Sequence, residues 1–356
     1  MAAKLILRSL QVLVLMALLL CLGCGSGPGK EDPEAPSHHG PQGFFNPHLP
    51  ERGRSFKDFL TWWFGLRKET PALPPGEVPP YQPRVVTLDL KQIRNPDPEV
   101  IQITWIGHDT FLIQVAGRIF LTDPIFSDRA SPVSFIGPKR KAPPGVPFED
   151  LPRIDAVIIS HNHYDHLDEP TVKRLGKNLQ YFVPLGLAGW FKSLGRNQVK
   201  EFDWWQAENL GPFKITSVPA QHFSMRTPFD RNRTLWCGWV LETPAGNLYF
   251  AGCSGYSPDF REIGERFGPL KLSLIPIGCY QPRWFMAPMH LNPPEAVRVH
   301  RELRSRQSIG IHWGTFRLTD EPMGEPPLYL KKALQEAGVP PEAFITMGIG
   351  ETRMFR

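Results

Sequence analysis

Residues 156–166 read Ala-Val-Ile-Ile-Ser-His-Asn-His-Tyr-Asp-His, and this stretch decides the fold. Its first five residues form a short apolar run, typical of a strand that is buried on both faces. The residues His161, His163, Asp165 and His166 follow directly, and imidazole and carboxylate are ligands that zinc or iron accepts. In a loop that turns from a strand into a helix, His161 and His163 can share one ion. Asp165 and His166 then face a second ion. We therefore predict a binuclear metal site.

Two metal ions need further ligands, which we expect at the ends of other strands. His222 follows the strand-like residues 214–218, and His312 ends the apolar strand predicted at 308–312. We predict that His222 completes the first ion and that His312 completes the second. The other histidines are expected elsewhere: near the pocket (His290), on the surface of a predicted helix (His300), and in a proline-rich segment (His38, His39 and His48).

Strand and helix patterns alternate through the rest of the chain. Buried strands are predicted at 101–105 and 272–276, and hairpins at 111–122 and 235–251. Helical patterns interleave with them, at 169–175, 187–194, 293–304 and 326–336. Strands with helices between them, and a metal motif directly after a strand, predict an α/β (α+β) fold of four layers. We expect this αββα sandwich to occupy residues 96–356.

The N-terminal residues 1–24 resemble the signal peptide of a bacterial lipoprotein. Lys4 and Arg8 precede an apolar run over 12–22, which is short for a membrane span of about 20 residues. The sequence Cys21-Leu22-Gly23-Cys24 resembles a lipobox, although that motif usually has leucine at the position of Cys21. An ordinary signal peptide and an uncleaved anchor are the alternatives. We expect lipidation at Cys24 and an exported protein held in the cell envelope by its acyl chains.

Residues 25–95 are predicted to be a proline-rich extension between the signal segment and the main domain. Residues 25–55 are rich in Gly, Pro, Ser and charge, so we expect a tether with little structure of its own. Residues 56–66 place four apolar side chains at helical spacing: Phe59, Leu60, Trp63 and Phe64. This aromatic amphipathic helix either packs onto the main domain or faces lipid near the mouth of the active site.

Composition and charge are those of an ordinary globular protein. The 356 residues are 41% hydrophobic and 21% charged, which is enough material for a buried core. The net charge of +5 is small for this length and does not indicate a nucleic-acid partner.

Segments on both sides of the metal motif are similar to one branch of the metallo-β-lactamase superfamily, the N-acylphosphatidylethanolamine-hydrolysing phospholipases D (NAPE-PLD). The HxHxDH pattern of residues 161–166 identifies only the superfamily, whereas Pro-Arg-Trp-Phe-Met at 282–286 and His-Trp-Gly-Thr-Phe at 312–316 are specific to the branch. The resemblance runs from about residue 43 to the C-terminus, with further matching segments at 43–47, 105–108, 122–126, 219–222, 250–252 and 276–280.

The resemblance implies a hydrolase with two zinc ions and a bridging aspartate just after Ala251-Gly252. This chain has Cys253 there. Thiolate is a strong zinc ligand, so we predict that Cys253 binds metal. A weakened or single-metal site is one alternative, and a disulfide with Cys237 on the neighbouring strand is another. The implied ligand sets are His161, His163 and His222 for one ion, and Asp165, His166 and His312 for the other.

The implied reaction is the cleavage of N-acylphosphatidylethanolamine into phosphatidic acid and an N-acylethanolamine. Two ions would lower the pKa of a shared water and supply a hydroxide nucleophile, with Asp165 and His166 as catalytic residues. The expected partners are a phospholipid and a membrane surface, without nucleic acid, and a homodimer is left open. The alternatives are a related hydrolase of lactones or soluble phosphodiesters and an inactive, lipid-binding envelope protein.

Further side chains are expected around the metal site. Asp123 and His108 are predicted to orient ligand histidines, with turn capping or loop hydrogen bonding as the alternative. Four residues are predicted to contact the substrate: Tyr280, Trp284, Phe285 and His290.

Overall fold

The computed structural model describes residues 36–49, 55–67, 69–74 and 76–356. The predicted signal peptide and the predicted lipidation at Cys24 lie outside the described residues. Within the described part of the chain, no helix combines the length and the apolar character that crossing a bilayer requires.

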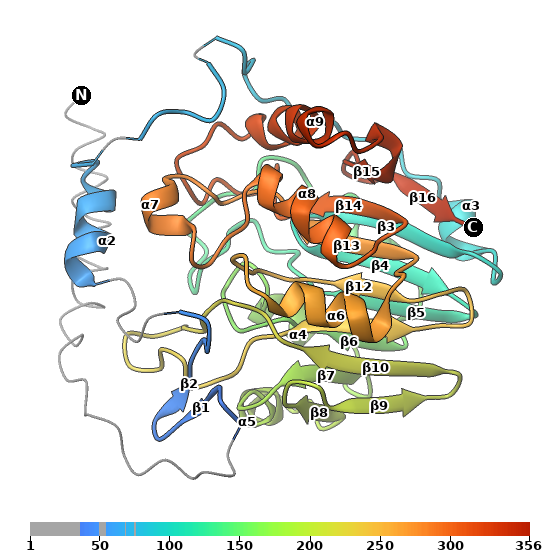
Figure 1. The fold of residues 1–356 in the computed structure, drawn as a ribbon. Helices are drawn as coiled ribbons and strands as arrows, with labels where there is room; N and C mark the ends of the chain where they lie inside the picture. Colours follow the sequence, from blue (N-terminus) through green and yellow to red (C-terminus); the bar gives the residue numbers. More distant parts are fainter. Residues whose placement is uncertain (1–35, 50–54, 68, 75) are drawn as a thin grey trace.

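Two mixed sheets, each of seven strands, pack against each other at the centre of the molecule (Figure 1). The order of the first sheet is β16-β3-β4-β5-β6-β7-β8, and that of the second is β15-β14-β13-β12-β11-β10-β9. The first contains β3 (Ile101–Gly107), β4 (Thr110–Val115), β5 (Arg118–Thr122), β6 (Ala156–Ile158), β7 (Gln180–Pro184), β8 (Val199–Phe202) and β16 (Thr352–Phe355). The second contains β9 (Ala207–Leu210), β10 (Phe213–Val218), β11 (Gly238–Glu242), β12 (Leu248–Phe250), β13 (Leu272–Pro276), β14 (Gln307–Ile311) and β15 (Phe344–Ile345).

Helices cover the outer face of each sheet, so the predicted αββα sandwich is confirmed. Apolar side chains of α3 (Leu90–Arg94), α4 (Glu169–Arg174) and α5 (Ala188–Ser193) join a buried cluster with the first sheet. Those of α6 (Asp259–Phe267), α8 (Pro293–Glu302) and α9 (Glu325–Ala337) form the corresponding cluster with the second sheet. The strands β7, β8 and β9 and the helices α3 and α6 were not predicted from the sequence.

The aromatic helix was predicted correctly and ends three residues earlier than expected. It is α2 (Phe56–Trp63), and a capping box between Ser55 and Asp58 fixes its start. Trp62 stacks on Phe285 of α7 (Arg283–Met286) with ring centroids 5.1 Å apart. The helix therefore packs onto the main domain through α7, as Figure 1 shows.

The predicted tether is wrong for residues 36–49. Two short strands, β1 (His39–Gly40) and β2 (Gly43–Phe44), pair with each other. His38 is buried, its Nε2 lies 2.6 Å from Asp203 Oδ1, and its ring stacks on Trp204. This segment is ordered by partners that are far away in the sequence, which composition alone does not reveal.

His300 was expected on the surface of its helix, and this expectation is also wrong. Its side chain is buried, and its Nδ1 lies 2.8 Å from Ser308 Oγ on β14. The helix α8 carries a wider buried face than its sequence pattern suggested, because it contacts α6 and α9 as well as the sheet.

Candidate metal centre

The predicted ligands come together because their strands end at the same edge of the sandwich. The strands β10, β12 and β14 run in one direction, as the pairing of their neighbours requires. His222, Cys253 and His312 follow the ends of these strands. The motif at 161–166 follows β6, which is parallel to β5. Four segments that are distant in the sequence therefore supply one site.

Three histidines form the first group of donors. His163 Nδ1 lies 2.9 Å from His161 Nε2 and 3.3 Å from His222 Nε2. The other nitrogens of the latter two rings are engaged, by Ser160 Oγ at 2.9 Å and by the Met289 carbonyl at 3.0 Å. Burial lowers the pKa of His163 to about 3, so its ring is neutral. Neutral imidazole nitrogens that converge in this way are suited to a shared metal ion.

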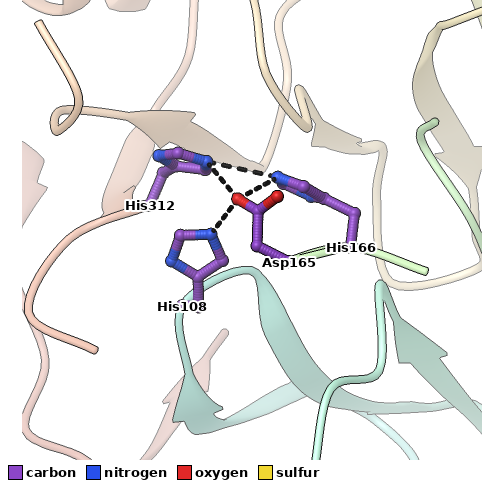
Figure 2. Close-up of side chains that lie close together, drawn as sticks. All are labelled: His108, Asp165, His166 and His312. Atoms are coloured by element: carbon purple, nitrogen blue, oxygen red, sulfur yellow. Dashed lines mark hydrogen bonds and ion pairs between the residues drawn. The ribbon is translucent and has the colours of Figure 1, made fainter. Parts of the chain in front are cut away.

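The second group contains Asp165, His166 and His312, whose polar atoms converge in Figure 2. Asp165 Oδ2 lies 3.1 Å from His166 Nε2 and 3.4 Å from His312 Nε2, and these two nitrogens are 3.2 Å apart. Burial lowers the pKa of His312 to about 3. For His166, burial also acts to lower the pKa, but the charge of Asp165 and hydrogen bonds with Asp123 and Asp165 outweigh burial and raise the pKa.

Asp123 orients both groups through one carboxylate. One of its oxygens accepts from His166 Nδ1 at 2.7 Å, which leaves His166 Nε2 directed at the other donors. The same oxygen accepts from Ser160 Oγ at 2.5 Å, and Ser160 Oγ in turn contacts His161. His108 behaves differently from the expectation. Its ring lies 4.1 Å from that of His312, but its Nε2 forms a hydrogen bond, at 2.9 Å, with the carboxylate of Asp165 and not with a histidine nitrogen (Figure 2).

Cys253 lies between the two groups of donors. Its Sγ is within 4.8 Å of ligand atoms of His161 and His222, and also within 4.8 Å of ligand atoms of His166 and His312. The loop that carries it needs glycine at position 252, since a Cβ there would lie 2.4 Å from the Ser160 Cβ. Cys237 and Cys253 are both free thiols, so the disulfide considered from the sequence does not form in this structure.

The sequence patterns did not single out Asp109, which the structure places in the site. One of its oxygens is within 4.8 Å of donor atoms of Cys253, His166 and His312. The only signal in the sequence was its place directly after His108, at the end of a predicted strand.

The four predicted substrate contacts have different positions. The His290 ring lies 5.1 Å from that of His222 and 5.6 Å from that of His312, at the margin of the site. Phe285 and Trp284 are half-buried on α7. Tyr280 is a correction: it is fully buried and its hydroxyl donates to Glu325 at 2.6 Å, so it supports the fold instead of facing a ligand.

The N-terminal segment contributes to the site as well. The Asn46 side-chain amide donates to the His222 carbonyl at 2.7 Å, and the His222 backbone N–H donates back to Asn46 Oδ1 at 3.1 Å. This pair of hydrogen bonds fixes the loop that carries one predicted ligand. The expectation of an unstructured tether had left no role for it.

Comparisons with known proteins agree with this geometry. Residues 118–313 match a family model described as "Beta-lactamase superfamily domain". The chain is 44% identical over 268 residues to "N-acyl-phosphatidylethanolamine-hydrolyzing phospholipase D 1" of Caenorhabditis elegans, an alignment covering 70% of this chain and 74% of that relative. It is 38% identical over 274 residues to an uncharacterised protein of Mycobacterium tuberculosis, covering 75% and 71% of the two chains.

Solved structures show the same fold at low sequence identity. An isothiocyanate hydrolase from Delia radicum gut bacteria superposes with a TM-score of 0.59 at 21% identity, covering 71% of this chain and 99% of that one. A metallo hydrolase from Ignicoccus hospitalis gives a TM-score of 0.55 at 23% identity, covering 72% and 99%. At these identities the likeness concerns the fold alone.

Proposed function

Because this chain belongs to the metallo-β-lactamase superfamily, in its NAPE-PLD-like branch, we propose that it is a zinc-dependent phosphodiesterase that hydrolyses N-acylphosphatidylethanolamine. The products would be phosphatidic acid and an N-acylethanolamine. The proposed dependence of the reaction on metal rests on one observation: two groups of donor side chains converge, and Cys253 lies between them. The 44% identity to a relative with this printed activity supports the choice of substrate.

The residues present fit two zinc ions. His161, His163 and His222 would hold one, and Asp165, His166 and His312 the other, with Cys253 in reach of both. When bound, two zinc ions lower the pKa of a shared water and neutralise negative charge that builds on a phosphodiester. Burial is the largest of several effects that raise the pKa of the Cys253 thiol to about 12, whereas a coordinating thiol is deprotonated by its metal.

The remaining polar residues orient the reacting groups. His108 holds the Asp165 carboxylate at 2.9 Å, and Asp165 would direct the attacking water. His290, at the margin of the site, would contact the phosphodiester. The aromatic side chains of α2 and α7 would contact the acyl chains. Trp62 of α2 stacks on Phe285 of α7, and Trp284 lies beside Phe285, so the two helices, which are neighbours in Figure 1, share one aromatic cluster.

The proposed substrate is a membrane lipid, so the location of the protein matters. We expect the protein to be exported and anchored in the cell envelope through lipidation at Cys24, which would keep the enzyme beside its lipid substrate. Labelling with radioactive palmitate tests this in the producing cells. Label should enter the wild type and be absent from Cys24→Ser, and equal labelling of Cys21→Ser would identify the modified cysteine.

The activity is tested with purified protein and N-acylphosphatidylethanolamine in mixed micelles. Phosphatidic acid should be released, a chelator should stop its release, and added zinc should restore it. His312→Ala should reduce the rate by at least about a hundredfold, whereas His48→Ala, an exposed histidine outside the site, should not. Turnover of lactones or soluble diesters alone would favour a related hydrolase. Lipid binding without any turnover would favour an inactive envelope protein.

A further inference from the structure

Asp109 is a buried carboxylate to which no side chain of the described residues donates a hydrogen bond. It lies in the turn between β3 and β4, and its side chain is fully excluded from solvent. Among the described residues, no side chain donates to either carboxylate oxygen, and the polar group that approaches it is the backbone of His312, itself a predicted ligand. The nearest cationic group, His166 Nδ1, is 3.6 Å away and already bonded to Asp123. Burying an ionisable group in this way is costly unless a partner compensates it. The structure therefore leaves this carboxylate in need of a partner.

The backbone on both sides of Asp109 is held so that the carboxylate faces the metal centre. His108 has a φ of 55°, a conformation that is rare for residues other than glycine, and its N–H donates to Thr315 Oγ1 at 2.6 Å. The Asp109 carbonyl accepts from Thr122 Oγ1, also at 2.6 Å. A carboxylate oxygen is thereby placed within 4.8 Å of donor atoms of Cys253, His166 and His312. Strained backbone that is fixed from both sides is typical of functional sites.

The neighbouring Cys253 is the position at which this chain departs from the family pattern. The pattern implies an aspartate there, and a carboxylate has two oxygens with which to bridge two ions. A thiolate offers one sulfur and the same negative charge. Asp109 and Cys253 both lie close to His166 and His312. The carboxylate of Asp109 is therefore next to position 253, where the family pattern has its bridging aspartate.

We propose that Asp109 is a metal ligand that acts together with Cys253 in place of the single bridging aspartate of the family. Its carboxylate would bind the ion held by Asp165, His166 and His312, and the Cys253 thiolate would bind at the junction of the two groups. The inference rests on the proposed metal centre but not on the proposed lipid substrate. A purely structural role for Asp109 is the competing explanation, and it would leave the buried carboxylate with the His312 backbone as its hydrogen-bond partner and with no side-chain donor among the described residues.

Zinc content and stability of the purified full chain test the role of Asp109. The variant is Asp109→Asn, which keeps the shape and removes the charge, and the control is Asp128→Asn, an exposed carboxyl nearby in the sequence. We expect the wild type and the control to retain two zinc ions after dialysis. Asp109→Asn should lose one ion, or bind it about 10- to 100-fold more weakly in a competition titration with a chromophoric chelator.

The stability of the metal-free proteins shows whether Asp109 is a metal ligand or has a purely structural role. Without metal, Asp109→Asn should melt at the same temperature as the wild type or higher, because a neutral amide, whose oxygen can accept the same backbone hydrogen bond, replaces a buried ionisable group. Zinc should then raise its melting temperature less than that of the wild type. A lower melting temperature of the metal-free variant, together with an unchanged zinc affinity, would overturn the proposal.

Exchanging the two residues provides a second test. Asp109→Ala alone should lose one ion, and adding Cys253→Asp to it should restore the second ion, because the carboxylate returns to the place that the family pattern implies. In the cobalt-substituted protein, the near-ultraviolet sulfur-to-cobalt band should be present in the wild type and in Cys237→Ser and absent from Cys253→Asp. Failure of the double variant to regain metal, with its fold intact by circular dichroism, would count against the exchange.

These measurements separate this inference from the proposed function. Metal loss in Asp109→Asn, in a protein that does not hydrolyse N-acylphosphatidylethanolamine, would support the ligand and contradict the substrate. If Asp109→Asn keeps its full zinc content and still hydrolyses the lipid, the result would support the proposed substrate and contradict the role of Asp109 as a ligand. A wild type that binds no zinc at all would contradict both.

Discussion

Asp123 is the single residue on which the order of the metal centre depends most. Its carboxylate contacts His166, Ser160 Oγ and the Ser160 backbone N–H, all within 2.7 Å. Burial raises its pKa, while the bonds with His166 and Ser160 oppose that shift. Since these contacts fix the ring orientation of His166 and the position of Ser160 beside His161, one side chain orients a member of each donor group.

The substitution Asp123→Asn tests this role. An amide does not accept from both partners as the carboxylate does, so His166 should lose its fixed tautomer and orientation. We expect zinc affinity to fall about 10- to 100-fold, measured by competition titration. Asp155→Asn, which removes a carboxyl at the opposite end of β6, is the matched control. Equal affinities of the two variants would contradict the orienting role.

At the scale of elements, the N-terminal segment and α2 are attached to the domain at different places. The segment 36–49 contacts the His222 loop, and α2 packs on α7 beside the same end of the sandwich. Both lie on the side of the molecule where the strands deliver the predicted ligands. The extension is therefore part of the functional end of the protein, rather than a spacer.

Asn46→Ala tests the contact of the segment with the site. It removes two hydrogen bonds to the His222 backbone and leaves a buried N–H and a carbonyl without partners, at a cost of about 1–3 kcal/mol in unfolding free energy. Denaturant unfolding measures this loss, and zinc affinity should fall as His222 becomes less well positioned. Asn209→Ala, on the exposed edge strand β9, should change neither quantity. Unchanged stability of Asn46→Ala would exclude an anchoring role for the segment.

The exposed end of α2 carries a prediction about lipid. Phe64 is 57% exposed and Leu66 is 74% exposed, although both are large apolar side chains. If this end enters the bilayer surface, Phe64→Ser with Leu66→Ser should weaken binding to phospholipid vesicles by at least about tenfold, since each side chain contributes about 1.5–3 kcal/mol when buried. The melting temperature should stay the same. Met354→Ser, on the distant strand β16, is the control, and equal vesicle sedimentation of all variants would contradict a lipid-facing end.

At the scale of the whole molecule, buried histidines couple stability to pH. In the metal-free protein, burial lowers the pKa of many histidines below its ordinary value of 6.5, to about 4 for His108 and about 3 for His163 and His312. The same direction holds for His38, His161, His222, His290 and His300. Only His166 among the site histidines has a raised pKa, so its protonation favours the folded state.

The metal-free protein should therefore lose stability as the pH falls below about 6.5. The unfolded chain takes up protons there that the folded chain does not bind until pH 3 to 4, and each such group costs about 1.4 kcal/mol per pH unit. His166, whose pKa is raised, gives its full stabilisation below pH 6.5 and therefore does not change with pH in this range. Thermal unfolding of chelator-treated protein between pH 6.5 and pH 5 measures the effect, with the melting temperature expected to fall. A constant or rising melting temperature would contradict the neutral state of these rings.

The sequence by itself determined the sandwich, the donors at 161–166, His222 and His312, and the departure at Cys253. These are local properties of the sequence. Apolar runs predict buried strands, and the predicted metal ligands lie within a few residues after such runs. The strands β7 and β8 of the first sheet, the edge strand β9 of the second sheet and the helix α6 were missed because their patterns are short or mixed, and tertiary packing decides such segments.

Only the tertiary structure decided which distant residues share the site. The turn after β3 brings Asp109 to Cys253, and the segment 36–49 brings Asn46 to His222, across more than a hundred residues of chain in each case. It also buried His300, which was expected at the surface of its helix, and Tyr280, which was expected to contact the substrate. Such contacts depend on how strands from two sheets end at one edge, and that arrangement is not encoded in any single stretch of sequence. The motif at 161–166 predicted that metal would bind, and the fold decided which carboxylate and which thiol lie beside it.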